Sequence, residues 1–338
     1  MAIFHPSKNP SYKTSEAVFW LARDGKRNVG RICAIVNHVA QGKWENKLGR
    51  FSFVNFIDDP EVSRVLFSTA EAWLKEQGCD GVIGPMGFTD IDEEGLLIEG
   101  FDEPGTLPML YAHPWYKTHI EALGYTKEID WLEHRLEVPP AIPKKILSAA
   151  EWARDLLPGV TILDAKKRSE FRPYIPGVFA LLNETYKHLF GTVEFTQEQA
   201  DFYAEQYFSF LHPAFTKLAL SPENKVIGLM IAMPTLSRAF QKARGHLFPF
   251  GFLHILKDMR KTEEVDIYLA ASHPEYDNSG LIALIAEAFI QALLDNGVKW
   301  VETSANLETN SRVLSFWKEF KHRQHKRRRV YKKMFIKK

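Results

Sequence analysis

The chain is poor in cysteine, in net charge and in long apolar runs. Its 338 residues include two cysteines, Cys33 and Cys79, which lack the spacing of a metal site or a disulfide framework and so predict a reducing compartment. The formal net charge of +1 gives no general reason to expect nucleic acid or an acidic substrate. No stretch of about 18 apolar residues occurs, and the N-terminal residues lack an apolar signal-peptide core. We therefore expect a cytoplasmic protein with no membrane partner and no bound metal.

The length predicts two domains, because 338 residues is about twice a typical single domain. A proline-rich seam divides the chain, where three prolines follow a strand-like run and a segment with apolar residues at helical spacing comes next. Proline removes a backbone donor and favours extended geometry in the residue before it, so the strand should stop near Val138. We predict domains over residues 1–138 and 159–338, joined by a linker and connecting helix over residues 139–158.

The two halves repeat one order of elements. In the first half, two β-rich runs flank Asp24-Gly25, a strong hairpin signal, and a third strand follows. A helix then begins with acidic residues and a proline and ends at Gly78. Each half continues as strand, helix, strand. The pattern predicts an α+β fold built twice.

This order of elements, with stretches such as "GPMGF", "EEGLLIEGFD" and "HPWYKTHIEALGY", resembles the GNAT superfamily of acyl-CoA-dependent N-acyltransferases. The resemblance covers nearly the whole chain as a tandem pair. It implies two GNAT-like domains, each a mixed, mostly antiparallel sheet flanked by helices. It also implies acetyl-CoA or another acyl-CoA as co-substrate and a small-molecule or peptide amine as acceptor. The first domain, whose helix begins at Asp58-Asp59-Pro60, should repel phosphate, so we assign the cofactor to the second domain.

In the superfamily, the loop after the fourth strand carries an Arg or Gln, then a Gly and a small residue, and its backbone N–H groups bind the pyrophosphate of coenzyme A. Here "DNSGLI" has Asp277 at the first position, keeps the glycine and has isoleucine at the small position. A helix cap without a ligand is the alternative explanation of this stretch. The cofactor contacts that the resemblance implies are Ala270, Ala271, Ser272, Asn278, Ser279, Gly280, Leu281, Ile282 and Asn310.

Transfer to an amine requires a base, and usually an acid for the leaving thiolate. Superfamily members often use a carboxylate on the fourth strand as base and a tyrosine on the fourth helix as acid. Alternation along "VDIYLAAS" puts Asp266 and Tyr268 on one face with Ala270 and Ser272, so the first two are candidate catalytic residues. Trp317 falls where the acid tyrosine would be, and indole has no proton to give near neutral pH. A sheet edge without chemistry is the other interpretation.

Two charged stretches have alternative interpretations. "DIDEEG", residues 90–95, is similar to the first half of a calcium loop but has Phe101 where the closing glutamate should be, so we favour a solvated acidic loop over calcium. An amine-attracting rim of a cleft is a second possibility. The C-terminal stretch "KHRQHKRRRVYKKMFIKK" is strongly basic but contains apolar residues for a final strand, and we favour a solvated strand and tail. Contact with the adenosine 3′-phosphate or with RNA is the alternative.

The sequence thus predicts a tandem GNAT protein that transfers an acyl group, with acetyl-CoA as the first candidate donor, to an amine in a cleft between the halves. One rival is a catalytically inactive GNAT-like module that binds a ligand or scaffolds a partner. Another is Fem-type aminoacyl transfer, which pairs two GNAT folds and uses charged tRNA. The acceptor, the acyl chain length and the oligomeric state are left open.

Overall fold

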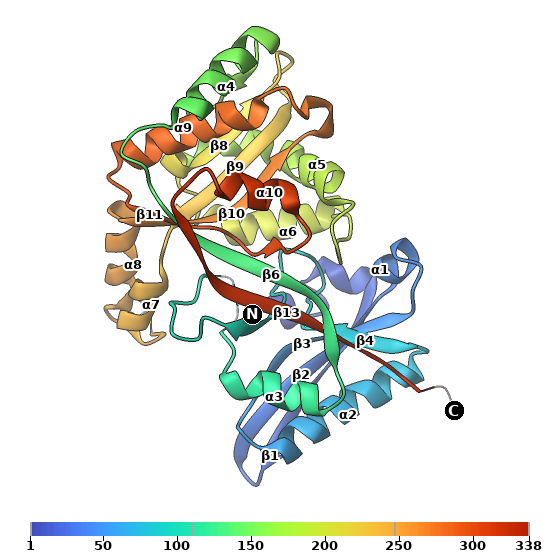
Figure 1. Cartoon of the computed structure of the whole chain (residues 1–338). Helices are drawn as coiled ribbons and strands as arrows, with labels where there is room; N and C mark the ends of the chain where they lie inside the picture. Colours follow the sequence, from blue (N-terminus) through green and yellow to red (C-terminus); the bar gives the residue numbers. More distant parts are fainter. Residues whose placement is uncertain (1, 108, 110, 247, 337–338) are drawn as a thin grey trace.

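The computed structural model describes residues 2–107, 109, 111–246 and 248–336. The first half follows the predicted order with a short helix and a short strand added (Figure 1). After two 3-10 turns, η1 (Ala2–Phe4) and η2 (Pro10–Lys13), its elements are β1 (Ser15–Asp24), β2 (Arg27–Asn37), α1 (His38–Lys43), β3 (Leu48–Phe56), α2 (Pro60–Glu76), β4 (Gly81–Gly84), β5 (Leu96–Glu99), α3 (Pro114–Ala122) and β6 (Thr126–Glu137).

Local sequence signals account for the ends of these elements. Gly25 has a φ of +56° in the turn that joins β1 to β2, a conformation that glycine adopts at little cost. At the start of α2, the Asp59 side chain accepts a hydrogen bond of 2.8 Å from the Glu61 N–H, and Pro60 occupies the first helical position. Gly78, with a φ of +76°, follows the end of the helix. The predicted hairpin and helix are confirmed.

The second half also keeps the predicted order and adds a pair of helices that were not predicted from the sequence. Its elements are α4 (Lys144–Leu156), β7 (Thr161–Ile162), η3 (Arg168–Tyr174), α5 (Ile175–Tyr186), α6 (Gln197–Phe208), η4 (Pro213–Phe215), β8 (Thr216–Leu220), β9 (Val226–Pro234), the added α7 (Ser237–Ala243) and α8 (Gly251–Arg260), β10 (Glu264–Ser272), η5 (Pro274–Tyr276), α9 (Leu281–Asp295), β11 (Trp300–Glu302), β12 (Asn306–Leu307), α10 (Ser311–Trp317) and β13 (His322–Met334).

One mixed sheet of 13 strands runs through both halves of the described chain, in the order β1-β2-β3-β4-β13-β6-β11-β10-β9-β8-β7, with β5 beside β13 and β12 beside β6. The last strand of each half lies at the centre. β6 pairs antiparallel with β13 along most of its length and also with β11, while β13 continues to β4 (Figure 1). The α+β fold with mixed, mostly antiparallel pairing is confirmed, and its two halves are joined by exchanged strands.

Each half nevertheless has its own hydrophobic core. Phe51, Phe67 and Leu74 belong to the core of the first half, together with Tyr331 of β13. The core of the second half lies between the sheet and helices α4 and α9, and it includes Leu136 of β6. Because each central strand contributes a buried residue to the core of the opposite half, the cores are coupled through β6 and β13.

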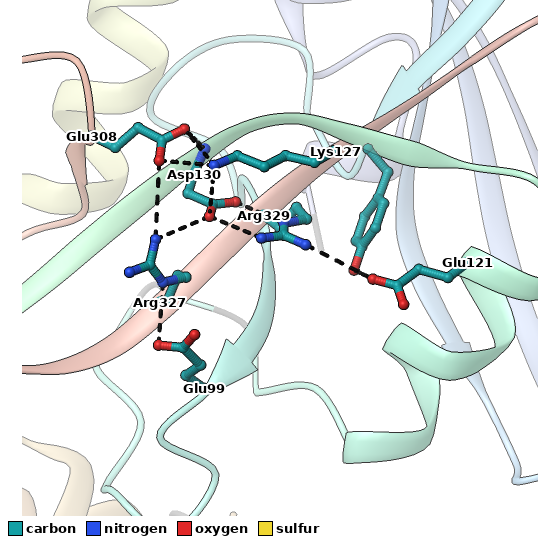
Figure 2. Close-up of polar contacts among 8 residues, drawn as sticks. Glu99, Glu121, Lys127, Asp130, Glu308, Arg327 and Arg329 are labelled. Atoms are coloured by element: carbon teal, nitrogen blue, oxygen red, sulfur yellow. Dashed lines mark hydrogen bonds and ion pairs between the residues drawn. The ribbon is translucent and has the colours of Figure 1, made fainter.

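Residues His322–Met334 of the basic C-terminal stretch form β13 inside the sheet, and the cations of this strand are paired. On one face of β13, Arg329 and Arg327 bond the carboxylate of Asp130, at 2.8 Å from Arg329 Nε and 3.1 Å from Arg327 Nη1 (Figure 2). Lys127 joins Asp130 at 3.2 Å and Glu308 at 2.8 Å. The predicted solvated strand is therefore wrong. Its acidic partners lie on elements far away in sequence, which a count of local charge does not reveal.

Candidate active site

An apolar cavity of about 170 Å³ lies between the two halves, against the face of β10 that is covered by α5 and α6. Loops of the first half close one side of it. Polar groups are few in its wall, and most of the lining is aliphatic or aromatic. The lining includes Asp90, Asp92, Thr106, Leu107, Tyr203, Ile231, Met233, Asp266, Tyr268, Leu269, Thr303 and Ser304. Such a pocket with a few inward polar groups is typical of a small-molecule site.

A β-bulge at Tyr268 shapes the wall of the cavity. The pairing of β10 with β9 shifts between Ile267 and Leu269, so that Asp266 lies opposite Met233 and Leu269 lies opposite Ile231. Cross-strand partners share a face of a sheet, and these two pairs line the cavity. The bulge therefore brings both Asp266 and Leu269 to the same face, with Tyr268 also in the lining.

The bulge corrects one prediction about this strand. Ala270 lies opposite Met230, and Ser272 lies opposite Gly228, whose missing side chain would point at α9. Both residues therefore lie on the α9 side of the sheet and not on the cavity side, so they do not share the face of Asp266 as strict alternation predicted. The Ala270 carbonyl accepts a hydrogen bond of 3.0 Å from the Tyr186 hydroxyl.

Asp266 is the most unusual carboxyl group of the cavity. The residue is 2% exposed, and its Oδ1 accepts a hydrogen bond from Thr235 Oγ1. Its Oδ2 is buried and has no hydrogen-bond partner among the described residues. Burial, and then the charge of Glu302, raise the pKa of Asp266 well above its usual range, although the Thr235 hydrogen bond opposes this. A carboxyl group with a raised pKa and a free oxygen is suited to exchange a proton with a ligand.

Tyr268 lies next to Asp266 in the lining and has a raised pKa as well. Burial is the main cause, and the negative charge of Asp266 adds to it. The phenol therefore stays protonated at neutral pH. Asp266 and Tyr268 thus line one cavity, and their catalytic roles stay a prediction.

The acidic loop of the first half reaches the same cavity and is not solvated, contrary to the favoured prediction. Asp92 is buried, and its Oδ2 accepts the N–H groups of Phe88 and Thr89 at 2.8 and 3.0 Å, while its Oδ1 accepts the Tyr203 hydroxyl at 3.1 Å. Asp90 contrasts with it, because its Oδ1 is buried without a hydrogen-bond partner in the described chain. Asp92 holds the loop in place, whereas Asp90 offers an unused oxygen.

A buried arginine explains why this acidic loop turns inward. The Arg50 guanidinium donates 2.8 Å hydrogen bonds to the carbonyls of Gly87 and Gly191, and its charge opposes the effect of burial on Asp90. Burial still raises the pKa of Asp90 to about 7. Arg50 lies 40 positions before the loop and ties it to the second half, so the local sequence gave no sign of this arrangement.

The predicted pyrophosphate loop follows β10 and keeps a turn that leads into a helix. Gly280, with a φ of +80°, is the N-cap of α9. Two of the expected donors are used inside the turn, because the Ser279 N–H bonds the Tyr276 carbonyl at 3.1 Å and the Leu281 N–H contacts Ser279 Oγ at 3.4 Å. The remaining predicted contacts in this loop are Asn278, with a φ of +60°, and the half-exposed Ile282.

The acidic residue of this loop has a cationic partner. Asp277 Oδ1 lies 2.8 Å from Arg312 Nη1 of α10. Asp277 alone would repel a bound anion, and the pair offsets this repulsion. It also brings a guanidinium to the loop, where the superfamily arginine is missing. Arg312 was missed because the motif concerns only the loop, whereas this cation comes from the next helix.

Gly280 has a packing role that does not involve a ligand. A Cβ at this position would lie 2.7 Å from Ala153 Cβ and 3.0 Å from the Ala149 carbonyl of α4. Close contact between α4 and α9, together with the left-handed backbone, is sufficient to require glycine. The single match to the superfamily motif is therefore explained by helix packing, and pyrophosphate binding stays a prediction.

Two other motif positions serve as structural elements of α10. Asn310 is the N-cap, and its Oδ1 accepts the Val313 N–H at 3.3 Å. Trp317 is buried and donates from Nε1 to Asn306 Oδ1 at 2.8 Å. A polar partner for the indole N–H is usual in a core, so Trp317 at the position of the acid tyrosine has a structural explanation.

One cluster in the described chain has the composition of a metal site, formed by Glu133, Glu302 and His325. Lys326 lies among these groups, with its Nζ 3.0 Å from Glu133 Oε2 and bonded to Glu302 Oε1. Arg328 bonds the other oxygen of Glu133 at 2.5 Å. The positive charge that these carboxylates need is thus supplied by two side chains of β13.

Comparisons with known proteins agree with this architecture. No protein-family model matches the chain. Protein YghO of Escherichia coli (strain K12) is 30% identical over 338 residues, covering 97% of this chain and 84% of that protein. The bacterial ceramide synthase of Caulobacter vibrioides (strain NA1000 / CB15N) is 26% identical over 252 residues, covering 74% of this chain and 65% of that protein. The second alignment thus spans less than two thirds of the synthase.

Solved structures resemble the fold over nearly the whole chain. A tandem GNAT protein from the clavulanic acid biosynthesis pathway has a TM-score of 0.55 at 12% identity and covers 98% of this chain and 85% of its own. A glucosamine N-acetyltransferase region of a fungal multi-domain β-N-acetylglucosaminidase has a TM-score of 0.54 at 13% identity, covering 94% of this chain and 33% of its own. The predicted tandem GNAT-like fold is confirmed. No helix among the described residues has the length and apolar character needed to cross a bilayer.

Proposed function

Because this chain belongs to the same protein family as YghO of Escherichia coli and has a tandem GNAT-like fold, we propose that it transfers an acyl group from acyl-CoA to an amine. The observation that carries the proposal is the free carboxyl oxygen of Asp266 in an apolar cavity. It lies where two parallel strands separate: β10 pairs with β11 from Glu264 to Asp266 and not beyond, and Thr303 and Ser304 line the cavity after β11 ends. The opening between the strands gives a thioester access to the carboxyl group.

The dimensions of the second half suit an elongated co-substrate. Ser272 lies six positions after Asp266 along β10, which corresponds to roughly 20 Å of strand. The loop with Gly280 and the Asp277 and Arg312 pair follows. A molecule that places a thioester at Asp266 and a phosphate group at this loop must be extended, as the pantetheine arm of coenzyme A is.

The chemistry assigned to the cavity is an amide-forming transfer. Ionised Asp266 accepts a proton from the amine, the amine nitrogen attacks the thioester carbonyl, and the C–N bond forms as the C–S bond breaks. Tyr268 supplies a proton to the departing thiolate and regains one from Asp266, so an amide and a free thiol result. Asp90, with its unused oxygen at the same cavity, favours an amine that arrives as an ammonium ion, which loses one proton to solvent before its neutral form reacts.

The apolar wall favours a hydrocarbon chain on one of the two substrates. A ceramide is an amide between a fatty acid and a long-chain amino alcohol, and one relative is a bacterial ceramide synthase. We therefore propose a long-chain acyl donor, a long-chain amine acceptor, or both, in preference to acetyl-CoA with a small polar amine. Fem-type transfer loses the support of the basic C-terminal stretch, because the cations of β13 are paired inside the sheet.

The test is thiol release from acetyl-CoA and palmitoyl-CoA across amines that range from small polar compounds to long-chain amino alcohols. We expect faster turnover with the long-chain substrates. Asp266→Asn should lower kcat by about 10²-fold or more and leave the affinity for acyl-CoA nearly unchanged, since a base acts in the transition state. Asp295→Asn, at the exposed end of α9, is the matched control and should retain full activity.

Other outcomes would separate the rival functions. Measurable acyl-CoA binding without turnover of any amine would favour a ligand-binding module. Equal turnover by the wild type and Asp266→Asn would remove Asp266 as the base. Transfer that requires charged tRNA would favour the Fem-type reaction.

A further inference from the structure

The hairpin of α7 and α8 exposes an unusual amount of apolar surface. Phe248 and Phe250, in the turn before α8, are 81% and 70% exposed. Leu253 and Leu256 of α8 are also exposed, and none of the described residues of that helix is buried. Single exposed apolar residues are common, but a cluster of large ones on one element marks an interaction surface.

The same segment is strongly basic. Residues 237–261 contain six Lys and Arg and one Asp, a formal charge of +5, in a chain whose net charge is +1. Among the described residues, no carboxylate lies within ion-pair distance of Lys242, Arg244, Lys257 or Arg260. The cations of β13, in contrast, are paired inside the sheet. The hairpin is therefore a site where positive charge is available to an outside partner.

The arrangement along α8 fits a surface between water and hydrocarbon. Phe252, Leu253 and Leu256 lie at helical spacing on one face, and each is exposed. Lys257 and Arg260 follow within one turn of Leu256. An apolar face flanked by cations is the pattern of helices that lie in the interface of a membrane, where long basic side chains reach the headgroups while the apolar residues enter the acyl region.

We propose that α7, α8 and the turn between them dock on the surface of a bilayer that contains anionic phospholipids. The charge of +5 selects an anionic surface, and the aromatic residues of the turn select a surface with an apolar interior. The expectation of no membrane partner depended on the lack of a long apolar run, which peripheral docking does not require. The proposal does not depend on acyl transfer.

The hairpin also adjoins the wall of the cavity. Ser237 of α7 donates a hydrogen bond to the Gly105 carbonyl, and Thr106 and Leu107, which follow Gly105, line the cavity. Met233, a cavity residue at the end of β9, lies four positions before Ser237. The start of the hairpin therefore contacts a loop that encloses the apolar cavity.

The experiment is co-sedimentation of the full chain with phosphatidylcholine vesicles that contain about one third phosphatidylglycerol, compared with vesicles of phosphatidylcholine alone. We expect binding to the anionic vesicles that weakens as salt is raised. The double variant Phe248→Ser/Phe250→Ser should bind at least about tenfold more weakly, because two large side chains no longer enter the apolar region. Lys257→Gln/Arg260→Gln should lower binding by roughly 25-fold, about fivefold per charge.

Leu156→Ser is the matched control, because Leu156 is 51% exposed but lies on α4 and has no part in the hairpin. It should bind like the wild type. Thermal denaturation of all variants should match the wild type, since the replaced side chains are exposed. Equal binding to both vesicle types, or an equal loss in Leu156→Ser, would overturn the proposal. A dimer that depends on Phe248 and Phe250 without vesicle binding would instead assign the surface to a second copy of the chain.

Discussion

Replacement of Asp130 tests whether the paired charges between β6 and β13 hold the two halves together. The Asp130 side chain is fully buried and bonds Arg329 through both oxygens, at 2.8 and 3.0 Å, with Arg327 at 3.1 Å and Lys127 at 3.2 Å. Figure 2 shows the carboxylate at the centre of these cations. Asp130→Asn keeps the size of the side chain and removes its charge, so it leaves two guanidinium groups without their shared anion.

The expected cost follows from the degree of burial. Loss of one partner from a buried ion pair typically costs about 3 to 5 kcal/mol. The Arg327 and Arg329 side chains remain 25% and 19% exposed, which lets water replace part of the lost interaction and favours the lower end, about 3 kcal/mol. Glu198→Gln, which breaks the exposed pair with Lys13, should cost about 1 kcal/mol or less.

The assay is urea denaturation of both variants and the wild type at a series of pH values. Burial alone would raise the pKa of Asp130, but hydrogen bonds from Arg329, Lys127 and Arg327 outweigh it and hold the pKa below its usual range. The stabilisation is therefore complete above the unfolded pKa near 4 and is lost as the pH falls through the folded pKa. A cost at pH 7 no larger than that of Glu198→Gln would refute the structural role of the cluster.

Two further predictions concern the second half. Gly280→Ala should lower the free energy of unfolding by about 2 to 5 kcal/mol, because the new Cβ strains a left-handed backbone and contacts α4. In the same denaturation assay, Gly297→Ala has open space around its Cβ and should cost only the backbone strain of about 1 to 2 kcal/mol. Burial raises the pKa of Asp266, so the free energy of unfolding should fall as the pH rises above about 4 towards the folded pKa, by at most about 1.4 kcal/mol per pH unit. Asp266→Asn should flatten this part of a plot of stability against pH. An unchanged slope would mean that Asp266 is ionised in the folded protein.

The parts of the fold that could be predicted depend on short-range signals. Asp24-Gly25 specifies the first hairpin, and Asp59-Pro60 specifies the start of α2, because turn geometry and helix capping act over a few residues. The repeated order of strands and helices in the two halves then predicted the tandem GNAT-like architecture. The exchange of β6 and β13 was not predicted, since the pairing of strands from opposite halves leaves no local pattern.

The site was predicted in part, and the errors have physical causes. Asp266 and Tyr268 line the cavity, in agreement with the predicted strand face, but Ala270 and Ser272 do not. One extra residue in a bulge reverses every later side chain, and periodicity cannot reveal where a bulge occurs. Residues such as Thr235 contact the site through tertiary structure alone, with no motif that would identify them.

The loop after β10 shows why a motif has to be judged by its surroundings. Its one matching residue, Gly280, is required by the packing of α4, so the match is not independent support for a phosphate site. Its mismatch, Asp277, is neutralised by Arg312 from α10, so the mismatch is not an argument against one either. Because both sequence signals are explained by neighbouring helices, the capacity of this loop to bind an anion depends on the backbone N–H groups that the turn leaves free and on the guanidinium of Arg312. An anion bound there would contact α9 and α10 together. Arg312→Gln should weaken the binding of this anion and leave the packing of Gly280 against α4 intact.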